Sequence, residues 1–326
     1  MQRGKRKNWR KNSEMSEENK MQSQIKSKHQ SVLLNEVIEG LNLTSRSVVL
    51  DGTFGGGGHS MEICKRHRGV KIIAIDQDQN AWEGAKEKFK NLDCDVSFHN
   101  ANFRNLDEVL KKEKLENVDA VILDLGLSSD QLENSGRGFS FLKDEPLYMR
   151  MKNKAKENPS PEDLTAQDIV NSWSEESLAD IIYGYGEERF ARRIARGIAE
   201  ATRAKEIKTT FDLVKVIEKM VPAGYRRGRL HFATRTFQAL RIAVNDELGA
   251  LKEGLVKGFD VLEAGGRMAI MSFHSLEDRI VKRFFKDREK ENLAKLINKK
   301  PIIAGREEIM NNPRARSAKL RILEKL

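Results

Sequence analysis

The stretch SVVLDGTFGGGGHS (47–60) sets four consecutive glycines shortly after an aliphatic run. The run at 47–51 contains β-branched residues and predicts a short buried strand. Glycine permits positive φ angles and lets a ligand approach the backbone, and a following helix offers free N–H groups in its first turn. Ligands of doubly wound sheets bind beyond the carboxyl ends of the strands. The stretch therefore predicts the ligand-binding loop of such a sheet.

The residues around this loop alternate between strand and helix patterns, which is typical of a parallel sheet with crossover helices. Further along, 265–273 predicts a fifth strand, and 301–305 and 317–325 can supply two final strands with a late antiparallel edge. The sequence thus predicts an α/β fold with a mostly parallel, seven-stranded sheet. The other predicted strands are 71–76, 95–101 and 119–125, and the predicted helices are 31–41, 61–67, 79–92, 105–115 and 276–288.

Residues 135–232 interrupt the alternation and predict an inserted all-helical subdomain. From residue 233 the first pattern resumes, and ATRTFQALRIAVNDELGAL (233–251) carries one apolar stripe at helical spacing. The predicted organisation is a disordered basic tail at 1–28, a sheet domain at 29–134 and 233–326, and the helical insertion at 135–232.

Positive charge is concentrated in two regions of the chain, whose net charge is +10. Residues 1–28 hold nine basic and three acidic residues, and residues 189–235 hold thirteen basic and four acidic residues. Such clustering indicates either a polyanionic partner, most simply nucleic acid, or a solvated tail and helix face. No apolar run is long enough to span a membrane, and the N-terminus lacks the apolar core of a secretory signal.

The chain has two cysteines, Cys64 and Cys94, and neither lies in a CxxC or Cys/His cluster. Two cysteines are too few for a disulfide framework, so we expect a reducing, cytoplasmic environment. The same spacing argues against a zinc site. We therefore expect no metal centre.

Three ligands commonly occupy a glycine loop of this kind. A nucleoside triphosphate loop needs Lys-Ser/Thr after the last glycine, which Gly58 lacks, and a dinucleotide fingerprint needs a third glycine where Ser60 stands. The third ligand, S-adenosylmethionine, needs bare backbone and an acid for its ribose hydroxyls. Asp76 ends the second strand, in the position of a ribose-binding acid; alternatively it caps the next helix.

Polar residues also follow the fourth and fifth strands. Asp124 comes directly after three apolar residues, where an unpaired buried acid is costly, so it meets either a ligand or a loop donor. Gln131 follows seven residues later and is placed for the mouth of a pocket. His274, after the fifth strand, is a candidate base or pocket-lining residue, unless Ser275 or Asp278 merely caps the next helix.

Nine blocks in order give the sequence a specific resemblance to a known family. It resembles the bacterial small-subunit ribosomal RNA cytosine-N4 methyltransferases, the MraW or RsmH family, from about residue 29 to the C-terminus. The blocks are HQSVLLNEVIEGL, DGTFGGGGHS, AIDQD, VILDLGLSSDQLE, RGFSF, YGEERFARRIAR, ATRTFQALRI, GGRMAIMSFHSLEDRIVKRFF and NPRARSAKLR.

The resemblance implies a class I methyltransferase fold with a helical insertion that recognises substrate, and S-adenosylmethionine as cofactor. The implied substrate is a cytosine in the decoding region of small-subunit (16S) ribosomal RNA, within the assembled 30S particle. Asp124 and His274 are then the candidate acceptors for the N4 proton. The implied cofactor contacts are Gly57, Gly58, His59, Asp76, Phe103, Asp124 and Gln131.

The chain departs from the family pattern at Tyr148, where the family has Asp, and at Phe232, where it has Pro. Both flank the predicted insertion and bear on substrate contacts. Two rival functions remain open at this point, a non-catalytic RNA-binding assembly factor and a dehydrogenase.

Overall fold

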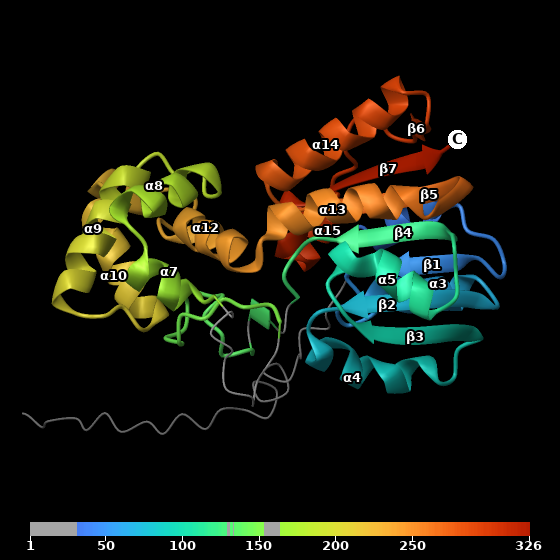
Figure 1. The fold of residues 1–326 in the computed structure, drawn as a ribbon, viewed down its shortest axis with the longest axis horizontal. Coiled ribbons are helices and arrows are strands. Elements are labelled where there is room, and N and C mark those ends of the chain that lie inside the picture. Colours follow the sequence, from blue (N-terminus) through green and yellow to red (C-terminus); the bar gives the residue numbers. More distant parts are fainter. Residues whose placement is uncertain (1–30, 129–130, 133, 153–163) are drawn as a thin grey trace, which may run out of the picture. The chain divides into compact units, whose positions relative to one another are not determined.

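A seven-stranded sheet with the order β3-β2-β1-β4-β5-β7-β6 forms the centre of the computed structural model (Figure 1). The structure describes residues 31–128, 131–132, 134–152 and 164–326; the predicted tail at 1–28 lies outside them. The predicted α/β class with its mostly parallel seven-stranded sheet is confirmed. The parallel strands are β1 (Val48–Asp51), β2 (Val70–Asp76), β3 (Cys94–Asn100), β4 (Val118–Asp124) and β5 (Leu262–Ser272), and the antiparallel pair is β6 (Ala294–Leu296) and β7 (Lys319–Lys325).

The prediction of a strand at 301–305 is wrong. That segment makes a single bridge, Ile302 to Leu320, and the edge strand β6 forms earlier in the chain.

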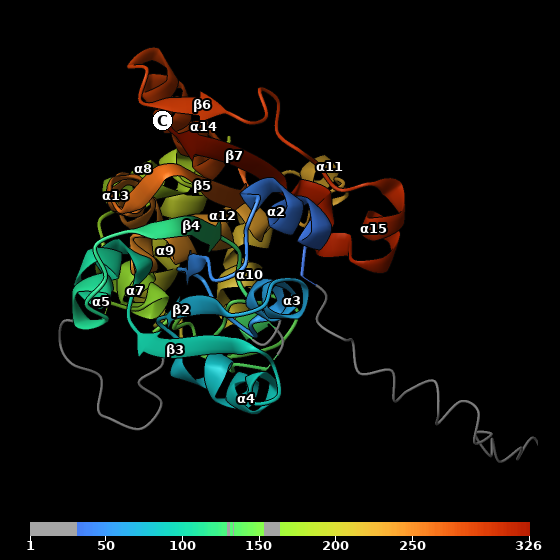
Figure 2. The ribbon, with the colours of Figure 1, turned by 90° about the vertical axis from the view of Figure 1, so that its right-hand side faces the viewer.

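Helices cover both faces of the sheet, as Figure 2 shows for α2 and α3 on one side and α5 and α13 on the other. Apolar side chains of each group pack against alternate residues of the central strands and form two separate cores. The first face carries α2 (Leu34–Leu41), α3 (Gly58–Arg66) and α4 (Gln79–Phe89), and the second carries α5 (Leu106–Lys112), α13 (Glu247–Asp260) and α14 (Ser275–Lys290). Short helices η1 (Phe103–Asn105), α15 (Arg306–Asn311) and η2 (Pro313–Ser317) connect strands.

A third core lies among helices of the predicted insertion. It includes Leu178, Ile194 and Ile217, which are fully buried, and its helices contact one another in the series α10, α9, α8 and α12. Among the described residues of the interval 135–232 no named strand occurs. The helices are α7 (Ala166–Ser172), α8 (Glu175–Gly184), α9 (Ala191–Ala204), α10 (Thr210–Met220) and α11 (Ala223–Arg226), joined by α12 (Thr234–Asn245).

The apolar stripe over 233–251 belongs to two helices with different partners. The helix is interrupted at Asp246, whose φ of 46° is left-handed. The α12 half packs into the helical core through Phe237 and Leu240, whereas the α13 half packs on the sheet through Leu251. The Asp246 carboxylate is held by Arg104 at 2.6 Å. Periodicity alone does not reveal such a break, because the spacing of apolar residues continues across it.

Cys64 on α3 and Cys94 at the start of β3 form a disulfide with Cα atoms 5.7 Å apart. The sequence indicated that two cysteines are too few for a disulfide framework, but the structure joins them in a single bridge. The two cysteines are 30 residues apart in the sequence. They come together because α3 packs beside the sheet edge where β3 begins. Within the described part of the chain, no helix combines the length and hydrophobicity needed to cross a membrane.

The break at Asp246 gives a direct test of backbone strain. Asp246→Gly and Asp246→Ala both remove the contact with Arg104, but only glycine adopts the left-handed conformation without cost. We expect the glycine variant to exceed the alanine variant in free energy of unfolding by about 1 kcal/mol. Urea denaturation of the two proteins measures the difference, and equal stabilities would contradict a left-handed Asp246.

Candidate functional site

The glycine loop leads directly into α3, so the helix N-terminus opens at the carboxyl end of β1. Gly57 has a φ of 73° and precedes the helix, and any Cβ there would collide with the ring of Phe54. A Cβ on Gly58 would collide with the hydroxyl of Ser31. These glycines therefore fulfil the predicted need for bare backbone, and the first N–H groups of α3 point away from the helix.

His59 lies beneath this loop and faces the protein interior. Its Nε2 lies 3.1 Å from the carbonyl oxygen of Val32. The side chain is buried, and this burial lowers the pKa of the imidazole. Next to it, Ser60 donates to Asp51 Oδ2 at 2.6 Å. Burial raises the pKa of Asp51 to about 6, although Ser60 opposes the rise. The side chain of His59 thus anchors the loop to the segment before α2, while its backbone stays in the first turn.

Asp76 holds the glycine loop from the neighbouring strand. Its Oδ2 accepts from Gly55 N at 2.7 Å and its Oδ1 accepts from Asp78 N at 2.8 Å. Burial raises the pKa of Asp76 to about 6, with both N–H donors acting against the rise. Since each carboxylate oxygen has two lone pairs, capacity for ligand hydroxyls remains. The alternative role as a side-chain cap of α4 does not occur, because the N-cap residue is Asp78.

Asp78 was not among the predicted contacts, although it follows Asp76 by two residues and strand alternation places both on one face. Its side chain is buried. Its Oδ2 accepts from Gln131 Nε2 at 3.3 Å and from Arg137 Nη2 at 2.5 Å. Its Oδ1 is buried without a partner among the described residues. Gln131 therefore does reach the same edge as Asp76.

Arg137, from the RGFSF block, joins this edge to the following loop. Its Nη1 donates to the carbonyl oxygens of Arg150 and Met151 at 3.1 and 2.8 Å. Met151 N in turn donates to Asn245 Oδ1, at the end of α12. The segment 137–151 is thus fastened at both ends, to Asp78 and to α12. The signal for this role in the sequence is the arginine of the RGFSF block, which could pair with a buried acid.

Phe103 is held in place by close packing. It lies in η1, directly after β3, and its ring meets α13 at Gly254, where any Cβ would come within 2.5 Å of Phe103 Cδ2. The ring is only partly buried. A flat apolar side chain so fixed can pack against a planar ligand group.

Asp124 ends β4, and its backbone N donates to Thr53 Oγ1 at 2.6 Å, which ties it to the loop after β1. Its Oδ1 is buried and has no hydrogen-bond partner in the described structure. Burial raises the pKa of Asp124 to about 7; the N–H of Gly126 opposes this rise and the nearby Glu277 adds to it. The carboxyl group is therefore poised to take a proton or a donor from a ligand.

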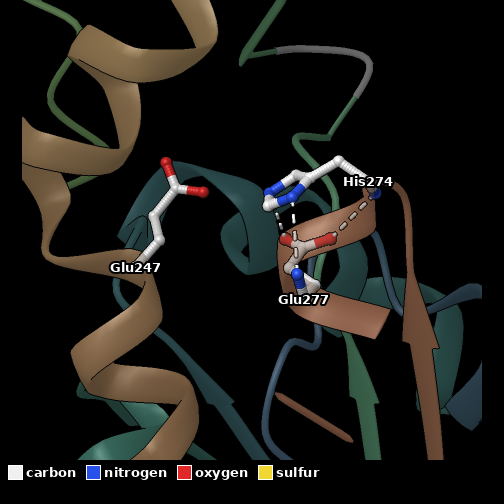
Figure 3. A group of neighbouring side chains, drawn as sticks. All are labelled: Glu247, His274 and Glu277. Atoms are coloured by element: carbon white, nitrogen blue, oxygen red, sulfur yellow. Dashed lines mark hydrogen bonds and ion pairs between the residues drawn. The ribbon is translucent and has the colours of Figure 1, made fainter. Parts of the chain in front are cut away.

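His274, Glu277 and Glu247 form a polar cluster (Figure 3), and Glu277 lies near enough to Asp124 to raise the pKa of that carboxyl. His274 is the N-cap residue of α14 and forms a capping box with Glu277, whose Oε2 accepts from Phe273 N at 2.8 Å. Asp278 instead pairs with Lys319 and Arg321. α14 therefore has a side-chain cap, but the capping residue is His274 itself and not Ser275 or Asp278.

The three ligand atoms of this cluster lie within 4.8 Å of one another. Glu247, however, receives two hydrogen bonds from Arg241 at 2.7 and 2.8 Å. Burial raises the pKa of Glu247, and the guanidinium counters it. These contacts account for the cluster without a metal ion, and we assign none.

The carboxyl ends of β1, β2, β3 and β4 thus bring together bare backbone, a partly exposed ring and three acids with raised pKa values. Two acid oxygens, Asp78 Oδ1 and Asp124 Oδ1, are buried without hydrogen-bond partners among the described residues. Such an edge favours a ligand that carries hydrogen-bond donors and positive charge, because both would lower the cost of burying these acids. S-adenosylmethionine has donors on its ribose and amino groups and a positive sulfur, so the residues present fit it.

The raised pKa of Asp124 makes a testable contribution to stability. A folded-state pKa of about 7 against an ordinary 3.8 means that the group costs nothing below pH 3.8 and destabilises progressively as the pH rises. We expect Asp124→Asn to gain stability relative to the unchanged protein between pH 4 and 8, by up to about 4 kcal/mol. Denaturation curves at several pH values measure this gap; a gap independent of pH would contradict the burial of the charge.

The profile of the MraW methylase family matches residues 26–326. The ribosomal RNA small subunit methyltransferase H of Brevibacillus brevis is 44% identical over 314 residues, which are 91% of this chain and 98% of that protein. The enzyme of the same name from Clostridium botulinum (strain Kyoto) is 46% identical over 92% of this chain and 99% of its own. The crystal structure of an rRNA methylase from Streptococcus thermophilus aligns over 91% of this chain and 98% of its own, with 12% identity and a TM-score of 0.41. The chain belongs to the MraW methylase family and is an S-adenosylmethionine-dependent methyltransferase.

Proposed function

We propose that this methyltransferase acts on the exocyclic N4 amine of a cytosine in the decoding region of small-subunit (16S) ribosomal RNA. The names of the relatives that are 43–46% identical support a small-subunit RNA substrate. The observation that carries the chemistry is the buried, unpartnered Oδ1 of Asp124 at the reacting edge of the sheet.

The cofactor contacts that we propose follow the geometry of the edge. The backbone of Gly57, Gly58 and His59 faces the amino-acid end, Asp76 takes ribose hydroxyls, and Phe103 packs on adenine. Asp124 and Gln131 complete the contacts. When bound, the cofactor supplies a methyl group on a positively charged sulfur.

Asp124 is the residue that we propose as acceptor for the amine. The lone pair of a cytosine amine is delocalised into the ring, so an acceptor on N4–H helps to localise it. As the nitrogen takes the methyl group, the proton that it loses passes to Asp124. A carboxyl pKa of about 7 suits this exchange near neutral pH. His274 is less suited, because its ring caps α14; we propose that it orients Glu277 beside Asp124.

The helical insertion, 135–232 together with α12, is the region that we propose to hold the RNA. Tyr183 is 69% exposed, so it does not pack in the core. Arg189 lies over the rings of Phe190 and Tyr225 at 4.8 and 5.0 Å. Exposed arginines beside rings suit phosphates and unstacked bases. A ribosomal substrate, within the assembled 30S particle, places the protein in the cytoplasm.

Methyl transfer to ribosomal subunits tests the reaction. Small subunits that lack the modification are incubated with protein and labelled cofactor, and the RNA is digested and mapped by mass. We expect one labelled cytosine, methylated at N4, in the decoding region. Label on carbon 5, or no label in the RNA, would contradict the proposal.

The pH dependence of kcat tests the role of Asp124. An acceptor must be ionised, so we expect kcat to rise with pH through an acidic limb. The limb should lie at or below pH 7, because the positive charge of the bound cofactor lowers the carboxyl pKa. Asp124→Asn should reduce kcat by roughly 10²–10⁴-fold and abolish the limb. A variant that keeps both would leave Asp124 without a role in proton transfer.

Cofactor affinity tests the placement of Phe103. Gly254→Ala pushes a methyl group into the Phe103 ring and should weaken cofactor binding by several-fold. Gly84→Ala, on α4 where nothing lies within 4 Å of the new Cβ, is the matched control and should leave affinity unchanged. Calorimetric titration measures both, with Asp76→Ala as a second loss-of-binding variant. Equal affinities in Gly254→Ala and Gly84→Ala would remove Phe103 from the site.

A further inference from the structure

A cavity of about 300 Å³ lies where β5 ends and β7 begins. Because β5 and β7 are antiparallel neighbours, the end of one and the start of the other meet at the same sheet edge as the cofactor residues. None of the proposed cofactor contacts lines it. Its described lining includes Phe273, His274, Ser275, Ile303, Arg316 and Lys319.

The charge of this cavity favours an anion. No acidic residue is among its described lining residues. Lys319 is shared with Asp278, at 3.0 Å. Arg316 is exposed, and the described structure records no ion pair for it. Ser275 lies at the N-terminus of α14, but Glu277 already caps that terminus and the Ser275 hydroxyl donates to Glu187, so Arg316 is the group available to an anion.

The lining of the cavity also includes apolar residues. Phe273 is partly buried, and Ile303 is 66% exposed although it is a large aliphatic residue. Exposed apolar surface beside a cation, within a cavity at the small end of ligand pockets, matches a group with one flat apolar face and one negative charge. A single nucleotide has both, in its base and its phosphate.

The cavity also borders the reacting edge. His274 lines it, and the same residue caps α14 through Glu277, whose charge raises the pKa of Asp124. Asp124 pairs with Met271 across β4 and β5, so Phe273 lies only two residues beyond that pair. A nucleotide in the cavity would therefore neighbour a base presented to Asp124.

We propose that this cavity binds one nucleotide of the RNA strand next to the methylated cytosine. Its base packs on Phe273 and Ile303, and its phosphate is held by Arg316. The proposal rests on the RNA substrate argued above. It gives the enzyme a contact with the RNA strand beside the target cytosine, through which it can sense the sequence or the geometry of the strand. Phosphate contacts fix the position of a strand, whereas stacking tolerates several bases.

Binding of a free nucleotide tests the site without methyl transfer. The full chain, labelled at isoleucine methyl groups, is titrated with cytidine 5′-monophosphate, with cytidine and with inorganic phosphate. We expect the monophosphate to shift the signals of Ile303 and Ile309, which both line the cavity, and to bind more tightly than either fragment. Absence of shifts at both residues would overturn the proposal.

Variants then separate this site from the reaction itself. Arg316→Ala should weaken monophosphate binding roughly tenfold and raise the KM for small subunits while leaving kcat nearly unchanged. Ile303→Ala should weaken the monophosphate and cytidine alike. Arg68→Ala, an exposed arginine before β2 at the opposite edge of the sheet, is the matched control.

The failures of the two proposals are distinguishable. If subunits receive no methyl group while the monophosphate binds at Ile303 and requires Arg316, the proposed RNA reaction fails and the nucleotide site stands. If methyl transfer occurs but Arg316→Ala and Arg68→Ala behave alike in both assays, the cavity is not a nucleotide site.

Discussion

The carboxylate of Asp76 is the interaction on which the site depends. It accepts backbone N–H groups from Gly55 on one side and Asp78 on the other, so one side chain fixes the loop after β1 and the turn after β2. A glycine-rich loop has the largest conformational entropy to lose on folding. Anchoring it from the adjacent strand, together with the contacts of His59 and Ser60, lets the first turn of α3 keep one orientation although the loop itself is mostly glycine.

The buried acids at this edge carry a cost to stability that a purely structural role does not explain. Asp51, Asp76 and Asp124 all have pKa values raised by burial, to between about 6 and 7. Each therefore reduces stability when it ionises. Proteins retain such costs where the groups act on a ligand, and a cationic ligand lowers them. If these carboxyl groups contact the cofactor as we propose, stability and cofactor binding are coupled through them.

Much of the fold could be predicted from local patterns, for physical reasons. Four β-then-α units identify a parallel sheet because crossover connections leave few other topologies, and acids at strand ends converge because those ends share an edge. The features that were missed depend on tertiary contacts. The break at Asp246 is hidden by a continuous apolar stripe, the position of β6 depends on pairing with β7, and the approach of Cys64 to Cys94 depends on packing. Phe103 required the family resemblance, whereas Asp78 follows Asp76 by two residues and could have been placed on the same face by strand alternation.

The ion pair between Asp78 and Arg137 links the carboxyl edge of the sheet to the segment that leads into the helical region. Arg137 also holds the carbonyls of residues 150 and 151, and Met151 is tied to α12. Any ligand that moves Asp78 therefore changes the conformational equilibrium of the segment 137–151. Any partner that moves this segment in turn changes the position of Asp78. Thermodynamic linkage requires the two effects to be equal in free energy. The order in which cofactor and substrate arrive can then alter the rates of assembly but not the stability of the ternary complex.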